Sequence, residues 1–519
     1  MERKNSDSGS DLREGLLSGV AAAQPEERIG IDEMLRLHAG EFGRWQLRHF
    51  VLTCAAWALE AFHVMVMIFA DRETARRCAG GGSGGCPPEP CGTPSAGWEW
   101  VEGAAASTVS EWGLVCGQRY KVGLVQAGFF AGCMIGAGVF GHLSDSFLGR
   151  KGSLTIVCVL NAITGLLTSL SQTYWVYAGL RFLTGFGTGG VGLCAFVLAT
   201  EPIGPSKRGV AGMSTFYFFS GGIAILSCVA YLIPTWRTLY VVTSIPSLLF
   251  VLVILPFVSE SPRWFLIRRR TSEAMDLMHL IARCNGRRIP PSVSLKLDDE
   301  DEEQPKESSN EAESGSIVDV FRSGTTRLRL ILMIGINLLC SVVYYGLTLN
   351  VVNLKTNLYL NVFLNAVSEM PAFVITALLL DRFGRKPLGL GTMLLSGVSC
   401  SVGFALGGTA GLFRTLRMVC GIVGIFGMAA MYNLLFIYTT ELFPTVVRNA
   451  ALGCVTQASQ LGAILAPLVV VAGERLPFAV FGACGLIGAL LTYFLPETMN
   501  KPLYDTMTGL EDGEGKFVE

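Results

Sequence analysis

The chain contains about twelve apolar runs that are each long enough to cross a lipid bilayer, since a membrane-spanning helix needs about 20 predominantly apolar residues. An apolar run of this length indicates a membrane-spanning helix, in which the backbone hydrogen bonds are made within the segment. The predicted spans are 47–70, 121–143, 152–171, 173–200, 209–233, 238–258, 328–350, 357–380, 388–406, 412–439, 447–472 and 476–495. The sequence therefore predicts an all-α membrane protein.

The composition agrees with a membrane-embedded chain. Hydrophobic residues make up 51% of the 519 residues and charged residues only 16%, whereas a soluble domain carries about 25% charged residues. The net charge of −1 says nothing about partners, because the charges are segregated by loop. Residues 1–45 are polar and show no secretory signal peptide, so we expect a tail.

The basic residues fall in alternate loops, which predicts the orientation of the chain. On one side lie Arg150, Lys151, Lys207, Arg208, Arg263, Arg268, Arg269, Arg270, Arg382, Arg385, Lys386 and Arg448. The opposite loops hold few, namely Arg237, Lys355, Arg475 and some in the first long loop. We therefore expect both termini to be cytosolic.

The first long loop, 72–119, is rich in Gly and Pro and contains Cys78, Cys86, Cys91 and Cys116. Four cysteines in a loop that faces outward or into a lumen predict two disulfides, with three possible connectivities. The other eleven cysteines lie mostly within spans and are expected to be free thiols that pack in the core.

Charged landmarks recur after 235 to 240 residues, which indicates that the chain was built twice. The pairs are Asp145 and Asp381, Arg150 and Arg385, Arg181 and Arg417, Glu201 and Glu441, Arg208 and Arg448, and Glu260 and Glu497. The predicted boundaries are a tail at 1–45, a half at 46–258, a cytosolic loop at 259–327, a half at 328–496 and a tail at 497–519. Two six-helix halves describe the major facilitator architecture, with a substrate site between them.

The central loop has two contrasting parts. Its first part, 264–284, is basic and amphipathic, whereas Asp298 to Glu303 form an acidic run within a polar segment. We expect that acidic run to be a solvated linker rather than a binding site.

Acids and arginines recur together at the cytosolic helix ends of both halves. They are Asp145, Arg150, Glu201 and Arg208 in the first half, and Asp381, Arg385, Glu441 and Arg448 in the second. Charges at a partly dry interface can pair in one state and be hydrated in another. We predict a cytosolic gate; the alternative is that these charges only set topology and loop structure.

Four motifs resemble one transporter family. They are SEWGLVC at Ser110–Cys116, PTWR at Pro234–Arg237, ESPRW at Glu260–Trp264 and YTTELFPTVVRN at Tyr438–Asn449. The chain resembles the organic cation, organic anion and carnitine transporters of the major facilitator superfamily over about 45–500. The extra residue in DSFLGRK, Asp145–Lys151, resembles the plant organic cation/carnitine branch.

Ionisable side chains within a span are functional candidates by default. Glu369 matches an acid that the family's cation and carnitine transporters carry in this span, so the resemblance implies a carboxylate facing an ammonium group; an internal pairing is the alternative. Aromatic residues can add cation–π contacts; the alternative for any single one is packing, and as a set we expect some of them to line the cavity. The predicted substrate-binding residues are Glu369, Phe216, Tyr217, Tyr344, Tyr345, Tyr432, Phe436 and Gln460. Phe218 is a further aromatic candidate.

Two positions depart from the family. Gln460 is neutral where the animal cation transporters carry an acid and the anion and carnitine transporters a base, which leaves the substrate's charge open. Glu60 and His63 lie three residues apart on one helical face, and together they can carry a coupling proton. A helix–helix hydrogen bond is the alternative for this pair.

We therefore expect a monomeric secondary transporter of small organic cations or zwitterions, carnitine-like or polyamines, proton-coupled by symport. An organic anion or sugar-like solute is the alternative substrate, and a non-transporting receptor the alternative class. The sequence lacks a Gly-x4-Gly-Lys-Ser/Thr loop and a His/Cys cluster with metal-ligand spacing, so we expect no enzyme, no cofactor and no metal. Nucleic acid is not an expected partner. The lipid bilayer is the plasma or the vacuolar membrane.

Overall fold

The structure is a computed structural model that describes residues 27–78, 98–296, 317–354, 356–406, 411–473, 475–499 and 510. Within these residues, 12 helices are long and apolar enough to cross a membrane. Each overlaps one of the runs expected from the sequence, with ends that differ by a few residues. The all-α prediction is confirmed.

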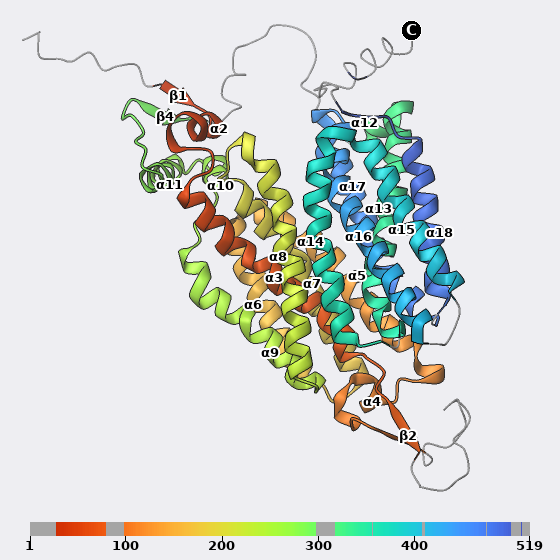
Figure 1. The fold of residues 1–519 in the computed structure, drawn as a ribbon. Coiled ribbons are helices and arrows are strands. Elements are labelled where there is room, and N and C mark those ends of the chain that lie inside the picture. Colours follow the sequence, from red (N-terminus) through yellow and green to blue (C-terminus); the bar gives the residue numbers. More distant parts are fainter. Residues whose placement is uncertain are drawn as a thin grey trace, which may run out of the picture.

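The chain forms two bundles of six long helices (Figure 1). The first holds α3 (Arg44–Ala70), α5 (Tyr120–Asp145), α6 (Gly149–Ser169), α7 (Tyr174–Thr200), α8 (Pro205–Leu232) and α9 (Trp236–Leu249), which a π-helical turn, Phe250–Ile254, extends. The second holds α13 (Gly324–Leu349), α14 (Leu358–Phe383), α15 (Arg385–Ala405), α16 (Gly411–Leu442), α17 (Thr445–Val470) and α18 (Leu476–Tyr493). The halves meet where α5 packs against α17 and α8 against α14.

Glycines allow α5 and α7 to pack closely. A Cβ at Gly185 or Gly189 on α7 would collide with the backbone of Phe129 or Cys133 on α5, and one at Gly132 would collide with α7 in return. Small residues that let backbones approach are a general device of helix packing in membranes. The glycine-rich middle of α7 therefore lets α5 and α7 pack closely in the core of the first half.

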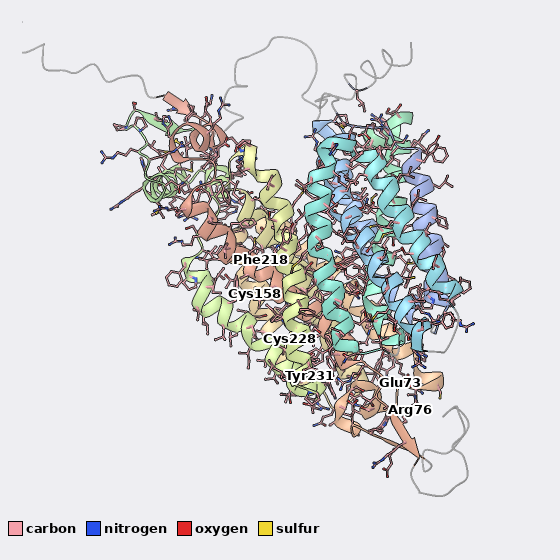
Figure 2. The ribbon with its side chains drawn as sticks, viewed as in Figure 1. Glu73, Arg76, Cys158, Phe218, Cys228 and Tyr231 are labelled. Carbon is pink, nitrogen blue, oxygen red and sulfur yellow. The ribbon has the colours of Figure 1, made fainter. Side chains whose placement is uncertain are left out.

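The outer end of the molecule, by which we mean the end that carries α4 (Thr108–Trp112), holds the cysteine loop. There β2 (Arg76–Cys78) pairs antiparallel with β3 (Trp98–Trp100), and Glu73 and Arg76 form an ion pair beside them (Figure 2). Cys116 is disulfide-bonded, whereas Cys86, Cys91 and the side chain of Cys78 lie outside the described residues. Eleven cysteines elsewhere are free thiols.

At the opposite, inner end, residues 27–43 are packed rather than forming part of the free tail expected for 1–45. The short strand β1 (Glu27–Ile29) pairs in parallel with β4 (Val293–Leu295) of the central loop. Beside this pair lie α2 (Ile31–Met34), α10 (Pro262–Ile267) and α11 (Thr271–Cys284) (Figure 1). Their apolar side chains form a separate small core. The scattered apolar residues of this segment are too few to be read as a core-forming pattern. The acidic run 298–303 lies outside the described residues.

Asp32 holds this N-terminal segment against the first bundle. It accepts hydrogen bonds from Arg208 of α8, at 2.6 Å, and from Arg263 of α10. Burial raises the pKa of Asp32, but the two guanidinium groups outweigh burial and leave the pKa below its ordinary value of 3.8. The ion pairs therefore stabilise docking above the ordinary carboxyl pKa, and the contribution is lost as the pH falls through the lowered pKa.

We expect Asp32→Asn to loosen residues 27–43 at neutral pH, because the amide carries no charge for the two arginines. Hydrogen–deuterium exchange of this segment should rise severalfold in the variant. Acidification below about pH 4 should raise the exchange of this segment in the wild type but not in Asp32→Asn. Glu33→Gln, on an exposed neighbour, is the control. Equal exchange in wild type and Asp32→Asn would contradict this prediction.

Candidate functional site

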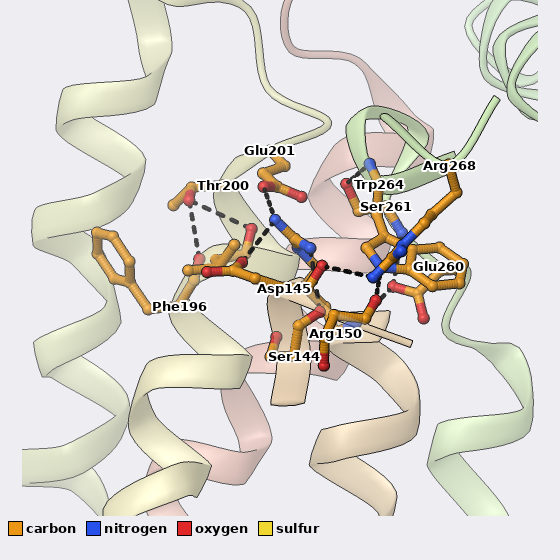
Figure 3. A network of polar contacts seen from close by, with 12 residues as sticks. Ser144, Asp145, Arg150, Phe196, Thr200, Glu201, Glu260, Ser261, Trp264 and Arg268 are labelled. Carbon is orange, nitrogen blue, oxygen red and sulfur yellow. Dashed lines mark hydrogen bonds and ion pairs between the residues drawn. The ribbon is translucent and has the colours of Figure 1, made fainter. Parts of the chain in front are cut away.

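A charged cluster closes the inner end of the first bundle (Figure 3). The guanidinium of Arg150 is buried, and its Nη2 lies 3.1 Å from Asp145 Oδ1 and 3.2 Å from Glu201 Oε1. Its Nη1 donates to the Ser144 carbonyl at 3.1 Å. Three of the four gate residues predicted in this half therefore lie together, because the end of α5, the start of α6 and the end of α7 are adjacent at the inner end.

Glu260, which lies between the last membrane span of the first half and α10, binds the start of α6. It accepts backbone N–H groups of Arg150 at 3.0 Å, Lys151 at 3.1 Å and Ser261 at 2.9 Å. Beside it, Trp264 Nε1 donates to the Ser146 carbonyl at 3.1 Å. Burial raises the pKa of Glu260. A carboxylate at a helix N-terminus satisfies free N–H groups and the helix dipole. The sequence marked Glu260 as a repeat landmark, not as part of the gate.

The second bundle repeats this arrangement. Arg385 Nη2 donates to Glu441 Oε1 at 2.8 Å, and Glu497 accepts the backbone N–H groups of Arg385 and Lys386, both at 2.9 Å. Burial raises the pKa of Glu497, but its backbone donors outweigh burial and leave the pKa lowered. The repeated geometry supports the internal duplication. Nothing is described of the Asp381 side chain.

Arg208 and Arg448 stand apart from these clusters. Arg208 pairs with Asp32, and both its Nε and Nη2 donate to the Ile203 carbonyl. Arg448 Nε donates to the Phe443 carbonyl at 3.4 Å, and its Nη2 has no partner among the described residues. The structure therefore does not bring either arginine to the glutamate that precedes it by seven residues.

Each inner cluster pairs within its own half. Among the described residues, no ion pair joins the two clusters. One turn before the inner end of α7, Phe196 faces Phe436 of α16 with ring centroids 5.8 Å apart. Phe436 thus lies at the inner end of the contact between the halves.

Gly149 and Gly384 occupy matching turns before α6 and α15. Their φ angles are +75° and +88°, and a Cβ would collide with Glu260 and Glu497, respectively. A side chain in this left-handed region costs about 1–2 kcal/mol before any collision. We expect Gly149→Ala and Gly384→Ala each to lower the thermal stability of the purified protein. Gly152→Ala is the control, since its Cβ would only touch Leu148 at 3.7 Å. Equal melting temperatures would contradict the prediction.

Glu369 connects the two halves in the middle of the membrane span. Its side chain is 1% exposed. Ser220 of α8 donates to its Oε2 at 2.5 Å, and Tyr344 of α13 donates to its Oε1 at 3.1 Å. Ser220 belongs to the first half and Glu369 to the second, so this hydrogen bond crosses the interface between the halves.

Aromatic rings surround this carboxylate. Tyr344 lies 5.2 Å from Tyr345 and 5.5 Å from Tyr432, measured between ring centroids, and Tyr345 lies 4.8 Å from Phe130 of the first half. Tyr432 also shares a hydrogen bond with Ser459, at 2.8 Å. We call Tyr344, Tyr345 and Tyr432 the tyrosine cluster. The structure thus brings these three predicted residues and Glu369 together.

The other predicted aromatic residues lie around this centre. Phe216 and Tyr217 both pack on Phe373, with centroids 5.9 and 5.5 Å apart, one turn beyond Glu369. Gln460 is half-buried on α17. Phe218 packs instead on Phe50, at 6.1 Å.

Glu60 and His63 share α3 but not a hydrogen bond. His63 is buried, and its Nε2 lies 2.9 Å from Ser247 Oγ on α9. Arg181 donates to the His63 carbonyl at 2.9 Å. Glu60 is half-buried, and its Oε2 has no hydrogen-bond partner among the described residues. The two predicted proton-coupling residues therefore have different surroundings.

The sequence reading missed a buried carboxylate at the outer end of α3. Asp71 Oδ1 accepts the hydroxyls of Thr108 and Tyr177, both at 2.7 Å, and its Oδ2 accepts Gln126 Nε2 at 3.4 Å. Beside it the halves also meet. Tyr359 of the second half stacks on Phe69 at 5.6 Å, and its carbonyl accepts the Ser227 hydroxyl at 2.6 Å.

In the part of the chain that is described, no three His, Cys, Asp or Glu side chains gather as metal ligands.

Comparison with known proteins places this geometry among transporters. Residues 96–509 match the family described as "Sugar (and other) transporter". Organic cation/carnitine transporter 4 of Arabidopsis thaliana is 63% identical, over 99% of this chain and 98% of the relative. The organic cation transporter protein of Drosophila melanogaster is 31% identical, over 94% and 95%. The inward-open xylose transporter XylE from E. coli has a TM-score of 0.64 at 19% identity, covering 90% of this chain and 99% of that chain, which shows the fold.

Proposed function

This chain belongs to the organic cation/carnitine transporters within the sugar (and other) transporter family and has the major facilitator fold, and from that premise we propose that it carries small organic cations or zwitterions by alternating access. The observation that carries the substrate class is Glu369, a carboxylate buried in the membrane-spanning region beside three tyrosines. A carboxylate next to aromatic faces matches the chemistry of an ammonium group. Carnitine-like compounds and polyamines both present such a group.

The proposed binding step exchanges a hydroxyl for the substrate. The ammonium group enters the tyrosine cluster and takes the place of Ser220 at the Glu369 carboxylate. Loss of the bond from Ser220 releases a contact between the halves, so binding favours their movement. The neutral Gln460 is compatible with a zwitterion, because its side-chain amide can donate a hydrogen bond to the carboxylate of the substrate.

The inner and outer contacts supply the two gates. At the outer end, Tyr359 is held by Phe69 and Ser227 across the halves. At the inner end, the clusters around Arg150 and Arg385 are paired within their own halves and are free to separate. We propose that this is a cytosol-facing arrangement, and that the loops of Arg150 and Arg385 approach each other when the site turns outward.

Transport is proposed to be proton-coupled through Glu60 and His63 of α3, in the plasma or vacuolar membrane. The alternatives are an organic anion or sugar-like solute, which the neutral Gln460 does not exclude by charge, and a receptor. A receptor would bind ligand without exchanging it across the membrane.

Uptake into proteoliposomes tests this proposal. Labelled carnitine and labelled tetraethylammonium are each offered with and without a pH gradient. We expect saturable uptake of at least one of them, accelerated by trans-side unlabelled substrate and altered by the gradient. If neither compound moves or competes for binding, the substrate class is wrong. Binding without counterflow would identify a receptor.

A further inference from the structure

Glu60 is an acid in the middle of a membrane helix for which the described residues provide no ion pair. It lies 16 residues into the 27-residue α3, and its side chain is partly exposed. Its Oε2 has no hydrogen-bond partner, and no ion pair to it occurs among the described residues. Opposite, on α7, Gly192 makes room for the carboxylate, since a Cβ there would lie 3.1 Å from its Oε1 and its Cδ.

The surroundings of Glu60 are aromatic and uncharged. Tyr345 of α13 and Tyr432 of α16 are within its electrostatic range, as are the thiols Cys133 of α5 and Cys158 of α6. Trp57, one turn earlier on α3, packs on Phe216 of α8 at 5.5 Å, and its indole N–H has no hydrogen-bond partner in the described part of the chain. Aromatic rings from both halves therefore flank the carboxylate.

The nearby charged and titratable groups are engaged elsewhere. On α3 itself, His63 is bonded to Ser247 of α9. Arg181 of α7 donates to the His63 carbonyl and lies over the Phe129 ring at 4.2 Å. Tyr240 of α9 shares its hydroxyl with Tyr177. None of these three groups forms a hydrogen bond or an ion pair with Glu60 in the described contacts.

A lone carboxylate in a membrane-spanning region cannot remain charged and unpaired without a large cost in free energy. It is neutralised either by a proton or by a bound cation, and it cannot hold both at once. Glu369 differs, because Ser220 and Tyr344 already occupy both of its oxygens. Glu60 and Glu369 thus border the same tyrosine cluster from opposite halves, one free and one bonded.

We propose that Glu60 is a shared site for a proton and for the ammonium group of the substrate, so that the protein exchanges protons for organic cations instead of moving both in the same direction. On one side of the membrane the arriving cation forms an ion pair with the Glu60 carboxylate, whose O–H bond breaks and whose proton leaves to water. On the other side the cation leaves and a proton returns to the same oxygen. Competition for one carboxylate is sufficient to couple the two fluxes. This inference rests on the proposed transport of organic cations.

Proton release on binding tests the shared site. Tetraethylammonium and carnitine are each added to the purified full-length protein in weakly buffered detergent solution, and a pH indicator follows the protons. At a pH where Glu60 is protonated, found by scanning from pH 5 to 8, we expect up to about one proton released per cation bound. Glu60→Gln should release none and bind the cation at least tenfold more weakly. Glu60→Asp should retain release, and Asp276→Asn, an exposed acid of α11, should behave as the wild type.

The direction of coupling gives a second, independent readout. In wild-type proteoliposomes, a lumen that is more acidic than the outside should drive accumulation of the cation, and the opposite gradient should not. Cation binding without proton release at any pH, or accumulation driven by protons entering with the cation, would overturn the shared site. If neither compound binds or moves, the proposed function fails instead. Size-exclusion and thermal-unfolding profiles identify a Glu60→Gln protein that has not folded, and the wild-type measurements alone then decide.

Discussion

Glu369→Gln should reduce the uptake of an organic cation by more than tenfold and leave the fold intact. The amide has nearly the shape of the carboxylate, and its oxygen can still accept one of the bonds from Ser220 and Tyr344. It has no charge to offer an ammonium group. A hydrogen bond to a charged partner contributes about 1.5–3 kcal/mol, which corresponds to a factor of roughly 10 to 150 in affinity at 1.4 kcal/mol per tenfold.

The measurement is the initial uptake rate of tetraethylammonium or carnitine against concentration. We expect the loss to be mainly a rise in KM, because the charge acts on binding. Ser220→Ala and Tyr344→Phe are the matched controls. Each removes one donor to Glu369 and keeps the charge, so each should change KM far less than Glu369→Gln. An unchanged KM in a well-folded Glu369→Gln protein would show that the substrate does not meet this carboxylate.

The sequence predicted the fold well because membrane helices are encoded locally. A run of apolar residues must be helical in the bilayer, so twelve runs and a repeated set of charges lead directly to two bundles. The residues at which helices begin and end were predicted less accurately than the number of helices. The helix α13 begins at Gly324, four residues before the expected span, because helical hydrogen bonding continues through polar residues beyond the apolar stretch.

The structure brings together only some of the predicted gate residues. Arg150 and Glu201 meet because short turns fix the neighbouring helix ends. Arg208 instead pairs with Asp32, which lies in a segment that looked like a free tail. A salt bridge to a distant part of the chain depends on tertiary packing. No periodicity in a single sequence predicts such a contact.

For the predicted binding residues as well, the sequence indicates which residues are candidates and does not indicate their contacts. Glu369 and the tyrosine cluster could be named as candidates from the sequence, because an ionisable side chain within a span is rare and expected to be functional, and because aromatic rings can form cation–π contacts with an ammonium group. Their contacts could not be predicted. Ser220, which crosses the interface to Glu369, is an ordinary hydroxyl in sequence, and Phe218 packs on Phe50 away from the cluster.

Asp71 is the clearest case of a residue that only the structure identifies. In sequence it follows the last residue of a span and precedes Arg72, Glu73 and Arg76, so it resembles a solvated loop acid. In the structure it is 6% exposed, because the loop helix α4 folds over it. Its carboxylate joins Thr108 of that loop to Tyr177 of α7 and Gln126 of α5.

Asp71→Ala should therefore destabilise the outer end of the first half more than any other change to a loop acid. The substitution leaves the Thr108 hydroxyl and the Gln126 amide without their acceptor in a buried place, and each buried group left unsatisfied costs about 1–3 kcal/mol. We expect the melting temperature in detergent to fall by several degrees and hydrogen exchange to rise across residues 101–116. Glu73→Ala removes an exposed acid two residues away, whose ion pair with Arg76 contributes little. If both variants melt at the same temperature, Asp71 does not anchor the loop; if Asp71→Ala alone is unstable, this one carboxylate holds the loop helix α4 against α5 and α7.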